Sequence, residues 1–360
     1  SSRLGGAAGS STLLVDTLLA AGVEVGWLLA PEHGVRGELE AGAKVEAGVD
    51  GPTGIPVISL YGARPGTPPE LPEELDLLLF DIQDVGARFY TYVSSMGLLM
   101  DAAAQAGIPL WVLDRPNPAG GNYVSGWDLE PEHRSFVGLY PMPMVHGMTL
   151  GELALLLHAE GHAGRVPDGA EAWAPRVIPM RGWTRDMLWP DTGLEWIPPS
   201  PNLPRFEHAY VYLGTCLVEG TTLSEGRGTP DPFLLLGSPG TRIEPGEAPP
   251  AIPGARVVVE TFTPVRIPGK AESPKFMDEP SVGVRIELTD PSRYDPVASG
   301  IVLIRWLMER SPEARTVPFL SRLAGTDAAA GILDGSSAPD SPPEFDSSVF
   351  RERRAPHLLY

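Results

Sequence analysis

Glu32 is the residue that the sequence places best for acid–base chemistry. It follows an apolar run and lies in a turn bounded by Pro31 and Gly34. A carboxyl group at the end of a strand, beside apolar side chains, is suited to donate a proton as a general acid. The neighbouring His33 adds a group that can bind a substrate. The alternative is a structural turn in which Glu32 only satisfies a local hydrogen bond.

Segment 81–92 (DIQDVGARFYTY) concentrates polar and aromatic groups in twelve residues. Two carboxylates, an amide, an arginine and two phenols are the donors, acceptors and ring faces that a polyhydroxylated ligand needs. Asp81 is therefore a candidate catalytic carboxylate, and the candidate substrate-binding residues are Gln83, Asp84, Arg88, Tyr90 and Tyr92. The structural alternative is that Asp84 caps the next helix and Arg88 pairs with it.

Segment 114–118 (DRPNP) contains two prolines, which fix the backbone and exclude a helix. A rigid loop after a strand suits a preorganised contact, so Asp114 is a candidate catalytic group and Asn117 a candidate binding group. Arg115 could bind a carboxylate in bidentate fashion, through two parallel N–H···O hydrogen bonds. It could equally form an ion pair with Asp114 that only shapes the loop.

Three later loops supply further candidates. His146 precedes Thr149 and Glu152, whose spacing matches a helix-capping box, so we expect Glu152 to be structural. Asn202 lies in a proline-rich loop, and both His146 and Asn202 are candidate substrate-binding residues. In the glycine-rich segment 224–229 (SEGRGT), Glu225 is a candidate catalytic residue and Arg227 a candidate binding residue. This segment matches neither phosphate-binding glycine motif.

The elements that position these residues alternate between strands and helices. Apolar runs predict strands at 23–30, 57–60, 75–81, 108–114 and 174–180, and helices are expected at 11–21, 96–106 and 150–160. This alternation predicts an α/β fold with a Rossmann-like, doubly wound and mostly parallel sheet. Glu32, Asp81 and Asp114 follow three of these strands. Since ligands bind outside the carboxyl ends of such strands, we expect one shared site.

A second, smaller α+β domain is predicted at the C-terminus. Segment 238–254 is rich in proline and glycine and has little periodicity. Strands are expected at 256–262 and 282–288 and a helix at 296–309. We therefore divide the chain into a catalytic domain, 1–238, and a C-terminal domain, 239–360.

Composition limits the classes of function. The chain has 360 residues and a formal net charge of −19, which disfavours binding to nucleic acid or to an anionic membrane surface. No apolar run is long enough to span a membrane. A single cysteine excludes a disulfide framework and a thiolate metal cage. Glu32, His33, Asp81 and His146 could form a carboxylate–histidine metal site, but their spacing does not require one, and we predict neither a metal nor a cofactor.

Seven motifs occur in an order that resembles the NamZ (YbbC-like) family of exo-β-N-acetylmuramidases, formerly a domain of unknown function. They are PEHGVRG (31–37), SLYG (59–62), FDIQDVGARFYTY (80–92), LDRPNP (113–118), HGMTLGELA (146–154), PSPN (199–202) and EGTTLSEGRGTPDPF (219–233). The resemblance implies a Rossmann-like domain followed by a smaller one, and release of N-acetylmuramic acid from the non-reducing ends of peptidoglycan fragments. It also implies a periplasmic or secreted location. The proposed catalytic glutamate of the family matches Glu32.

Hydrolysis of a glycosidic bond requires an acid and a second group on the other side of the bond. With Glu32 as the acid, the second group could be Asp81, Asp84, Asp114, Glu225 or the N-acetyl group of the substrate itself. The lactyl carboxylate of N-acetylmuramic acid needs a cationic partner in the protein. The candidates for this contact are Arg88, Arg115 and Arg227. The rival functions are a non-catalytic module that binds muropeptides or acidic sugars, and a metal-dependent carbohydrate deacetylase. The sequence does not predict the oligomeric state.

Overall fold

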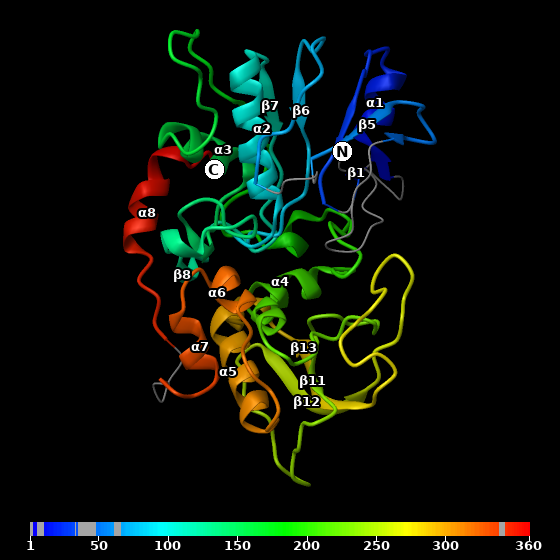
Figure 1. Ribbon diagram of the computed structural model, residues 1–360, viewed down its shortest axis with the longest axis vertical. Helices are drawn as coiled ribbons and strands as arrows, with labels where there is room; N and C mark the ends of the chain where they lie inside the picture. Colours follow the sequence, from blue (N-terminus) through cyan, green and yellow to red (C-terminus); the bar gives the residue numbers. More distant parts are fainter. Residues whose placement is uncertain (1–2, 6–10, 33, 35–47, 61–65, 338–342) are drawn as a thin grey trace.

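The computed structural model describes residues 3–5, 11–32, 34, 48–60, 66–337 and 343–360. These residues form an upper half with parallel strands and a lower half with an antiparallel sheet (Figure 1). The described helices are α1 Leu14–Ala20, α2 Tyr92–Ala106, α3 Leu150–Ala159, α4 Phe206–Thr215, α5 Pro296–Glu309, α6 Phe319–Ala324, α7 Ala328–Leu333 and α8 Ser348–Arg354. The described strands are β1 Arg3–Gly5, β2 Ser11–Leu13, β3 Leu28–Ala30, β4 Gly48–Val49, β5 Pro56–Ser59, β6 Leu78–Phe80, β7 Leu110–Leu113, β8 Ser125–Asp128, β9 Pro143–Val145, β10 Arg176–Ile178, β11 Leu235–Ser238, β12 Ala255–Phe262 and β13 Ser281–Leu288.

Parallel strands organise the upper half, as the α/β pattern predicts. One sheet has the order β10-β7-β6 with both pairings parallel, and in a second sheet β3 pairs parallel with β5. Strands β3, β6, β7 and β10 are shorter than their apolar runs, whereas β5 has the expected length and begins one residue earlier. In the run at 23–30, Val23 and Trp27 are exposed and only the last three residues pair. The apolar run therefore located the strand correctly but overstated its length.

Helices α2 and α3 pack against each other in the upper half. Helix α2 begins at Tyr92, four residues before the expected start, because segment 81–92 leads directly into it. It ends at Gly107, whose positive φ of 67° provides the left-handed C-cap. Helix α3 begins with the predicted capping box between Thr149 and Glu152.

The lower half contains an antiparallel sheet with the order β11-β13-β12, covered by helices. Helix α5 has the bounds that the sequence predicts. It crosses α4 at Gly214 and Gly300, where a Cβ on either residue would collide with the backbone of the other helix. Two glycines therefore permit the close approach of these helices.

The C-terminal segment returns to the upper half, where α8 leads back toward α3 (Figure 1). The Tyr360 hydroxyl donates to Asp114 Oδ2 at 2.7 Å, and the Leu359 backbone N–H donates to Glu152 Oε1 at 2.9 Å. Strand β11 precedes residue 239, yet it pairs with β13. The division into 1–238 and 239–360 stays a prediction.

The buried apolar residues form two large clusters. One packs the parallel strands β6 and β7 against α2 and α3, and the other joins residues near Phe89 to α4, α5 and β13. The second cluster spans both halves, so the hollow between the halves has a packed floor. Within the described ranges, no helix is long and apolar enough to cross a bilayer.

Candidate active site

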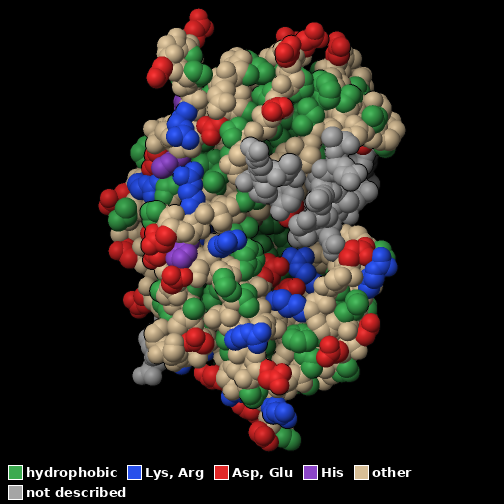
Figure 2. Space-filling model, in the orientation of Figure 1, with side chains coloured by type: hydrophobic (Ala, Val, Ile, Leu, Met, Phe, Trp, Pro, Cys, Tyr) green, Lys and Arg blue, Asp and Glu red, His purple; other side chains and the backbone are tan. Residues whose placement is uncertain are grey.

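Three predicted carboxylates lie just beyond the carboxyl ends of parallel strands. Glu32 follows β3, Asp81 follows β6 and Asp114 follows β7, and all three are buried. Figure 2 shows a hollow between the two halves of the molecule, with acidic and basic side chains side by side on its lower wall. This is the edge at which open α/β sheets bind ligands.

Glu32 is held at its position by residues at the start of α2. The Thr91 hydroxyl donates to Glu32 Oε2 at 2.6 Å. The Tyr92 hydroxyl lies 3.4 Å from the Glu32 backbone oxygen and donates to the Pro199 carbonyl at 3.0 Å. Glu32 is 9 % exposed, so it borders the hollow without being freely solvated. A fixed, partly desolvated carboxyl group suits proton transfer.

Asp84 and His146 form a second buried pair near Glu32. Burial raises the pKa of Asp84 to about 7, although the Gly86 backbone N–H donates to its Oδ2 at 2.8 Å. Burial also lowers the pKa of His146 to about 3, so this imidazole is neutral. Its Nδ1 accepts from the Met148 backbone N–H, and its Nε2 lies 3.9 Å from Asp84 Oδ2. Near neutral pH, Asp84 can therefore exist as an acid or as a base.

Aromatic rings connect these carboxyl groups to the lower half. Tyr90 contacts Tyr92 edge to face, with ring centroids 4.8 Å apart, and Tyr212 at 6.2 Å. The pKa of Tyr90 is raised by burial first and then by its charged neighbours, which include Asp84 and Glu32. Both carboxyl groups thus lie near the Tyr90 ring, as expected for one site.

Arg115 pairs with Asp81 and not with Asp114. Its Nε donates to Asp81 Oδ1 at 2.6 Å, and its side chain is 18 % exposed. Its two terminal nitrogens donate to no residue that the structure describes. The outer edge of the guanidinium is therefore available for a ligand, while the inner edge is fixed by Asp81.

Glu225 and Arg227 lie in a charged cluster of the lower half. Arg227 donates to Glu219 Oε1 at 2.8 Å, and its Nε lies 3.5 Å from Glu225 Oε1. The Lys275 ammonium lies 3.0 Å from Glu225 Oε2. The neighbouring carboxylates, against the effect of burial, raise the pKa of Arg227 further. Each charge in this cluster is thus close to an opposite charge.

Several of the predicted residues carry buried polar atoms without a hydrogen-bond partner. Within the described part of the chain, these atoms are Gln83 Oε1, Asp84 Oδ1, Arg88 Nε, Tyr90 OH and His146 Nε2. Glu225 Oε2 also accepts no hydrogen bond from a described residue, but it lies 3.0 Å from the Lys275 ammonium. Since most buried polar atoms in folded proteins are paired, Asp84 Oδ1, Tyr90 OH and His146 Nε2 are candidates to bind a ligand.

Arg88 and Asp114 make hydrogen bonds that favour structural roles over the expected binding and catalytic roles. Arg88 is 1 % exposed and donates to the backbone oxygens of Trp127, Met142 and Leu323. Its guanidinium joins the two halves and does not face the hollow. Both carboxylate oxygens of Asp114 are occupied, because they accept from Thr149 and Tyr360 hydroxyls and from the Arg115 and Gly151 backbone N–H groups.

Three polar side chains with predicted binding roles hold the loops of the site. The Gln83 amide donates to the carbonyls of Asp84 and Pro116. Asn117 donates to Met148 O and accepts from the Ala119 backbone N–H. The Asn202 amide donates to Lys270 O at 2.8 Å. These contacts occupy part of the hydrogen-bonding capacity of the Asn117 and Asn202 amides, and their expected contacts with substrate stay a prediction. His33 lies outside the described residues.

Two residues of the site were missed by the sequence analysis. Thr91 fixes the Glu32 carboxyl group, and Lys275 neutralises Glu225. Thr91 lies within segment 81–92 and could have been noted as a hydroxyl beside the candidate acid. Lys275 is fifty residues from Glu225 in a loop without periodicity, and no sequence signal connects the two.

No group of three or more potential ligands (His, Cys, Asp or Glu) lies close enough to hold a metal ion among the residues that the structure covers. Glu32, Asp81 and His146 therefore do not form such a group within that part of the chain.

The fold and the site define a two-part α/β protein with a carboxylate-rich site at the ends of parallel strands. Sequence models of the exo-β-N-acetylmuramidase NamZ match residues 5–207 with the N-terminal domain and residues 210–360 with the C-terminal domain. The chain therefore belongs to the NamZ family, as the seven motifs predicted.

Individual relatives agree with this family. The chain is 40 % identical over 344 residues to the peptidoglycan β-N-acetylmuramidase NamZ of Bacillus subtilis (strain 168), covering 92 % of this chain and 79 % of that protein. A crystal structure of a DUF1343 family protein from Bacteroides fragilis NCTC 9343 has a TM-score of 0.77 at 28 % identity, covering 96 % of this chain and 89 % of that one. A second protein of that family and organism has a TM-score of 0.70 at 31 % identity, covering 97 % and 90 %. The predicted α/β fold class is thereby confirmed.

Proposed function

We propose that this chain is an exo-β-N-acetylmuramidase, a glycoside hydrolase that releases N-acetylmuramic acid from the non-reducing ends of peptidoglycan fragments. The observation that carries the proposal is the 40 % identity to a peptidoglycan β-N-acetylmuramidase over 92 % of the chain. The buried carboxyl groups at the ends of the parallel strands supply the groups that this reaction needs.

Glu32 is the general acid in this proposal. It would protonate the leaving oxygen as the bond to the anomeric carbon breaks, and water would complete the hydrolysis. The hydrogen bond from Thr91 supports this role, because it fixes one carboxyl oxygen and thereby the direction of the other.

Asp84 is the proposed second carboxyl group. Asp114 is less suited because it already accepts four hydrogen bonds, Asp81 pairs with Arg115, and Glu225 pairs with Lys275 and Arg227. Asp84 Oδ1 accepts no hydrogen bond from any described residue. A carboxyl group with a pKa of about 7 can orient the N-acetyl group of the substrate or activate a water molecule.

Arg115 is the proposed partner of the lactyl carboxylate. The ion pair with Asp81 holds Nε of Arg115 in place. Both terminal nitrogens remain available to donate to the two oxygens of a ligand carboxylate, as a bidentate contact requires. Arg227 is less suited, since two carboxylates already surround it, and Arg88 is buried between the two halves.

The experiment measures the activity of the Glu32→Gln and Asp84→Asn variants on two substrates. One is a natural disaccharide, and the other is a 4-nitrophenyl N-acetylmuramide. Loss of a positioned acid costs ~10²–10⁴-fold in rate. Because 4-nitrophenolate leaves without protonation, Glu32→Gln should lose far more activity on the disaccharide than on the activated substrate. Asp84→Asn should lose comparable activity on both. Glu24→Gln, at an exposed glutamate of the same half, is the matched control and should behave like wild type.

Near wild-type turnover of the disaccharide by Glu32→Gln would reject Glu32 as the acid. The opposite pattern, with Asp84→Asn selectively impaired on the disaccharide, would assign the acid to Asp84. Absence of any release of N-acetylmuramic acid by the wild-type chain would reject the proposed function itself.

A further inference from the structure

A pocket of about 270 Å³ lies on the outer side of α2, away from the carboxyl groups of the active site. Its walls come from α2, from residues 134–140, from the loop that follows α3 and from Gly66 and Pro68 in the segment between β5 and β6. Asp101 of α2 lines the pocket and is nine residues beyond Tyr92, the first residue of this helix. At 1.5 Å per residue, this places the pocket about 14 Å along α2 from the end that contacts Glu32.

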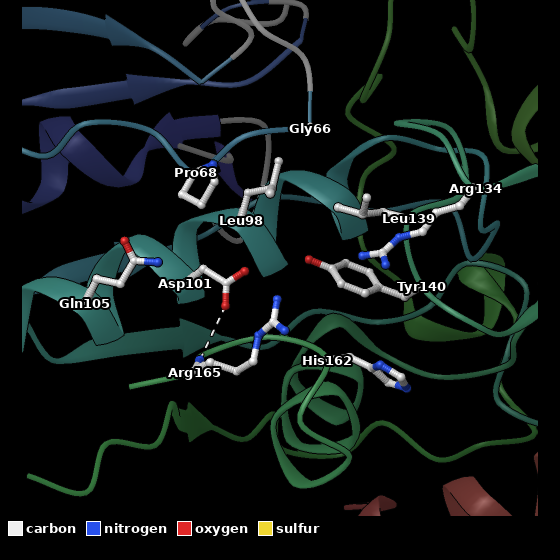
Figure 3. Close-up of a pocket in the computed structure, with 10 residues that line it drawn as sticks. All are labelled: Gly66, Pro68, Leu98, Asp101, Gln105, Arg134, Leu139, Tyr140, His162 and Arg165. Carbon is white, nitrogen blue, oxygen red and sulfur yellow. Dashed lines mark hydrogen bonds between the residues drawn. The ribbon is translucent and has the colours of Figure 1, made fainter. Parts of the chain in front are cut away.

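Two guanidinium groups face this pocket without a protein partner. Arg134 and Arg165 both line it, and neither side chain forms a hydrogen bond or an ion pair with any residue that the structure describes. Both arginines are exposed residues, so their guanidinium groups can be reached from solvent. Figure 3 shows both guanidinium groups directed into the same space as the Tyr140 hydroxyl and the Asp101 carboxylate.

Tyr140 supplies a buried hydroxyl with no partner. The residue is 2 % exposed, and its hydroxyl forms no hydrogen bond within the described part of the chain. The ring is held close to Gly97 of α2, where a Cβ would collide with the hydroxyl. Burial raises the pKa of Tyr140, so the hydroxyl keeps its proton and remains a donor. A buried donor that points into a pocket indicates an acceptor on a ligand.

One carboxylate oxygen of Asp101 accepts hydrogen bonds from the protein, and the other is available to a ligand. Its Oδ1 accepts from the backbone N–H groups of Gly164 at 2.8 Å and Arg165 at 3.3 Å, which fixes the side chain. Its Oδ2 accepts no hydrogen bond from a described residue. Because this carboxylate faces the two guanidinium groups across the pocket, the site presents separated positive and negative charge (Figure 3).

From this arrangement we propose that the pocket binds an amino-acid zwitterion, with its carboxylate on Arg134 and Arg165 and its ammonium on Asp101 Oδ2. The Tyr140 hydroxyl would donate to the same ligand carboxylate. Phosphate could pair only with the arginines and a simple cation only with Asp101, whereas a zwitterion pairs with both kinds of charge. Leu98, Leu139 and Pro68 form an apolar wall for the ligand side chain.

The zwitterion can be a free amino acid or an amino-acid centre carried at the end of a larger molecule. Alanine represents the first source. Nε-acetyl-lysine represents the second, because its zwitterionic centre lies at the end of a long, blocked side chain. Acetate, methylamine and inorganic phosphate each carry only one kind of charge and serve as comparison probes.

The experiment is isothermal titration of the full chain with each probe. Alanine, Nε-acetyl-lysine or both should bind saturably at one site, at least tenfold more tightly than acetate, methylamine or phosphate. Arg165→Met should weaken the binding of the zwitterion by at least tenfold. Asp101→Asn should do so too, because its carbonyl oxygen can still accept from the Gly164 and Arg165 backbone N–H groups while the ammonium loses its partner. Arg181→Met, at an exposed arginine outside the pocket, should bind as wild type does.

The proposal is overturned if no probe binds saturably, or if acetate or phosphate binds as tightly as alanine. It is also overturned if Asp101→Asn, with native near-ultraviolet circular dichroism, binds alanine as wild type does. Cleavage of a chromogenic N-acetylmuramide by all variants should match wild type, because none of these residues belongs to the proposed catalytic machinery. The binding result therefore stands or fails independently of the proposed hydrolase activity.

Discussion

Replacement of Asp84 by asparagine should change how the stability of the protein depends on pH. Burial raises the native-state pKa of Asp84 from 3.8 to about 7. Between these two pH values the native state holds a proton that the unfolded state has released, so acid stabilises the fold through this group. That contribution is complete below pH 3.8 and is lost as the pH rises through 7.

The size of the effect follows from linkage. At 1.36 kcal/mol per pKa unit, protonation of Asp84 contributes about 2–3 kcal/mol at pH 5 and almost nothing at pH 8. In Asp84→Asn this pH dependence disappears. The asparagine carbonyl can still accept from the Gly86 backbone N–H, whereas its buried amide gains no partner, at a pH-independent cost of about 1–3 kcal/mol. Relative to wild type, the variant should therefore gain about 2–3 kcal/mol between pH 5 and pH 8.

Other titrating groups cancel in this comparison. His146 has a lowered pKa, so its contribution to stability is lost as the pH falls below its unfolded value, which is the opposite sign to Asp84. Its shift comes from burial, Arg354 and Arg88, and these remain in the variant. Tyr90, Tyr92 and Glu32 also lie near Asp84 and are unchanged.

The assay is urea unfolding of wild type and Asp84→Asn at pH 5, 6, 7 and 8, followed by both circular dichroism and tryptophan fluorescence. Coincident transitions by the two probes are required before free energies are compared. Asp76→Asn, at an exposed aspartate, is the control and should show a difference from wild type that does not change with pH. If the difference between Asp84→Asn and wild type is also constant across this range, the interpretation of Asp84 as a buried group with a raised pKa is wrong.

Three further predictions concern the charged residues around the site. Arg115→Met should lower kcat/KM for the muramic substrate by about ten- to a hundredfold, with little effect on an N-acetylglucosamine analogue, and a larger selective loss in Arg227→Met would reassign the lactyl contact. Arg88→Met should lower the free energy of unfolding by at least about 3 kcal/mol, because three backbone carbonyls lose their donor; unchanged stability in urea would contradict the structural role. Glu152→Gln should keep turnover within a few-fold while costing about 1–3 kcal/mol through its contact with Arg185, and a hundredfold loss of turnover in a folded variant would restore a catalytic role.

The sequence by itself determined much of the local structure and indicated where a candidate site lies. Dense apolar runs located β6 and β7, and the spacing of Thr149 and Glu152 located the first turn of α3. These features depend on contacts within a short stretch of chain, so periodicity and capping preferences predict them. Polar residues after parallel strands indicated the site edge, because that edge follows from sheet topology alone.

Only the tertiary structure decided what each polar side chain does there. Arg88 and Arg115 are equally plausible partners for a carboxylate in the sequence. In the structure, however, Arg88 lies between the two halves and donates to backbone carbonyls that include Leu323, far away along the chain. Asp114 accepts a hydrogen bond from the hydroxyl of the last residue, Tyr360, and Lys275 pairs with Glu225 from a loop fifty residues away. Whether a charged group serves a ligand or the fold depends on which partners reach it. Those partners come from distant parts of the chain, so local sequence patterns carry no information about them.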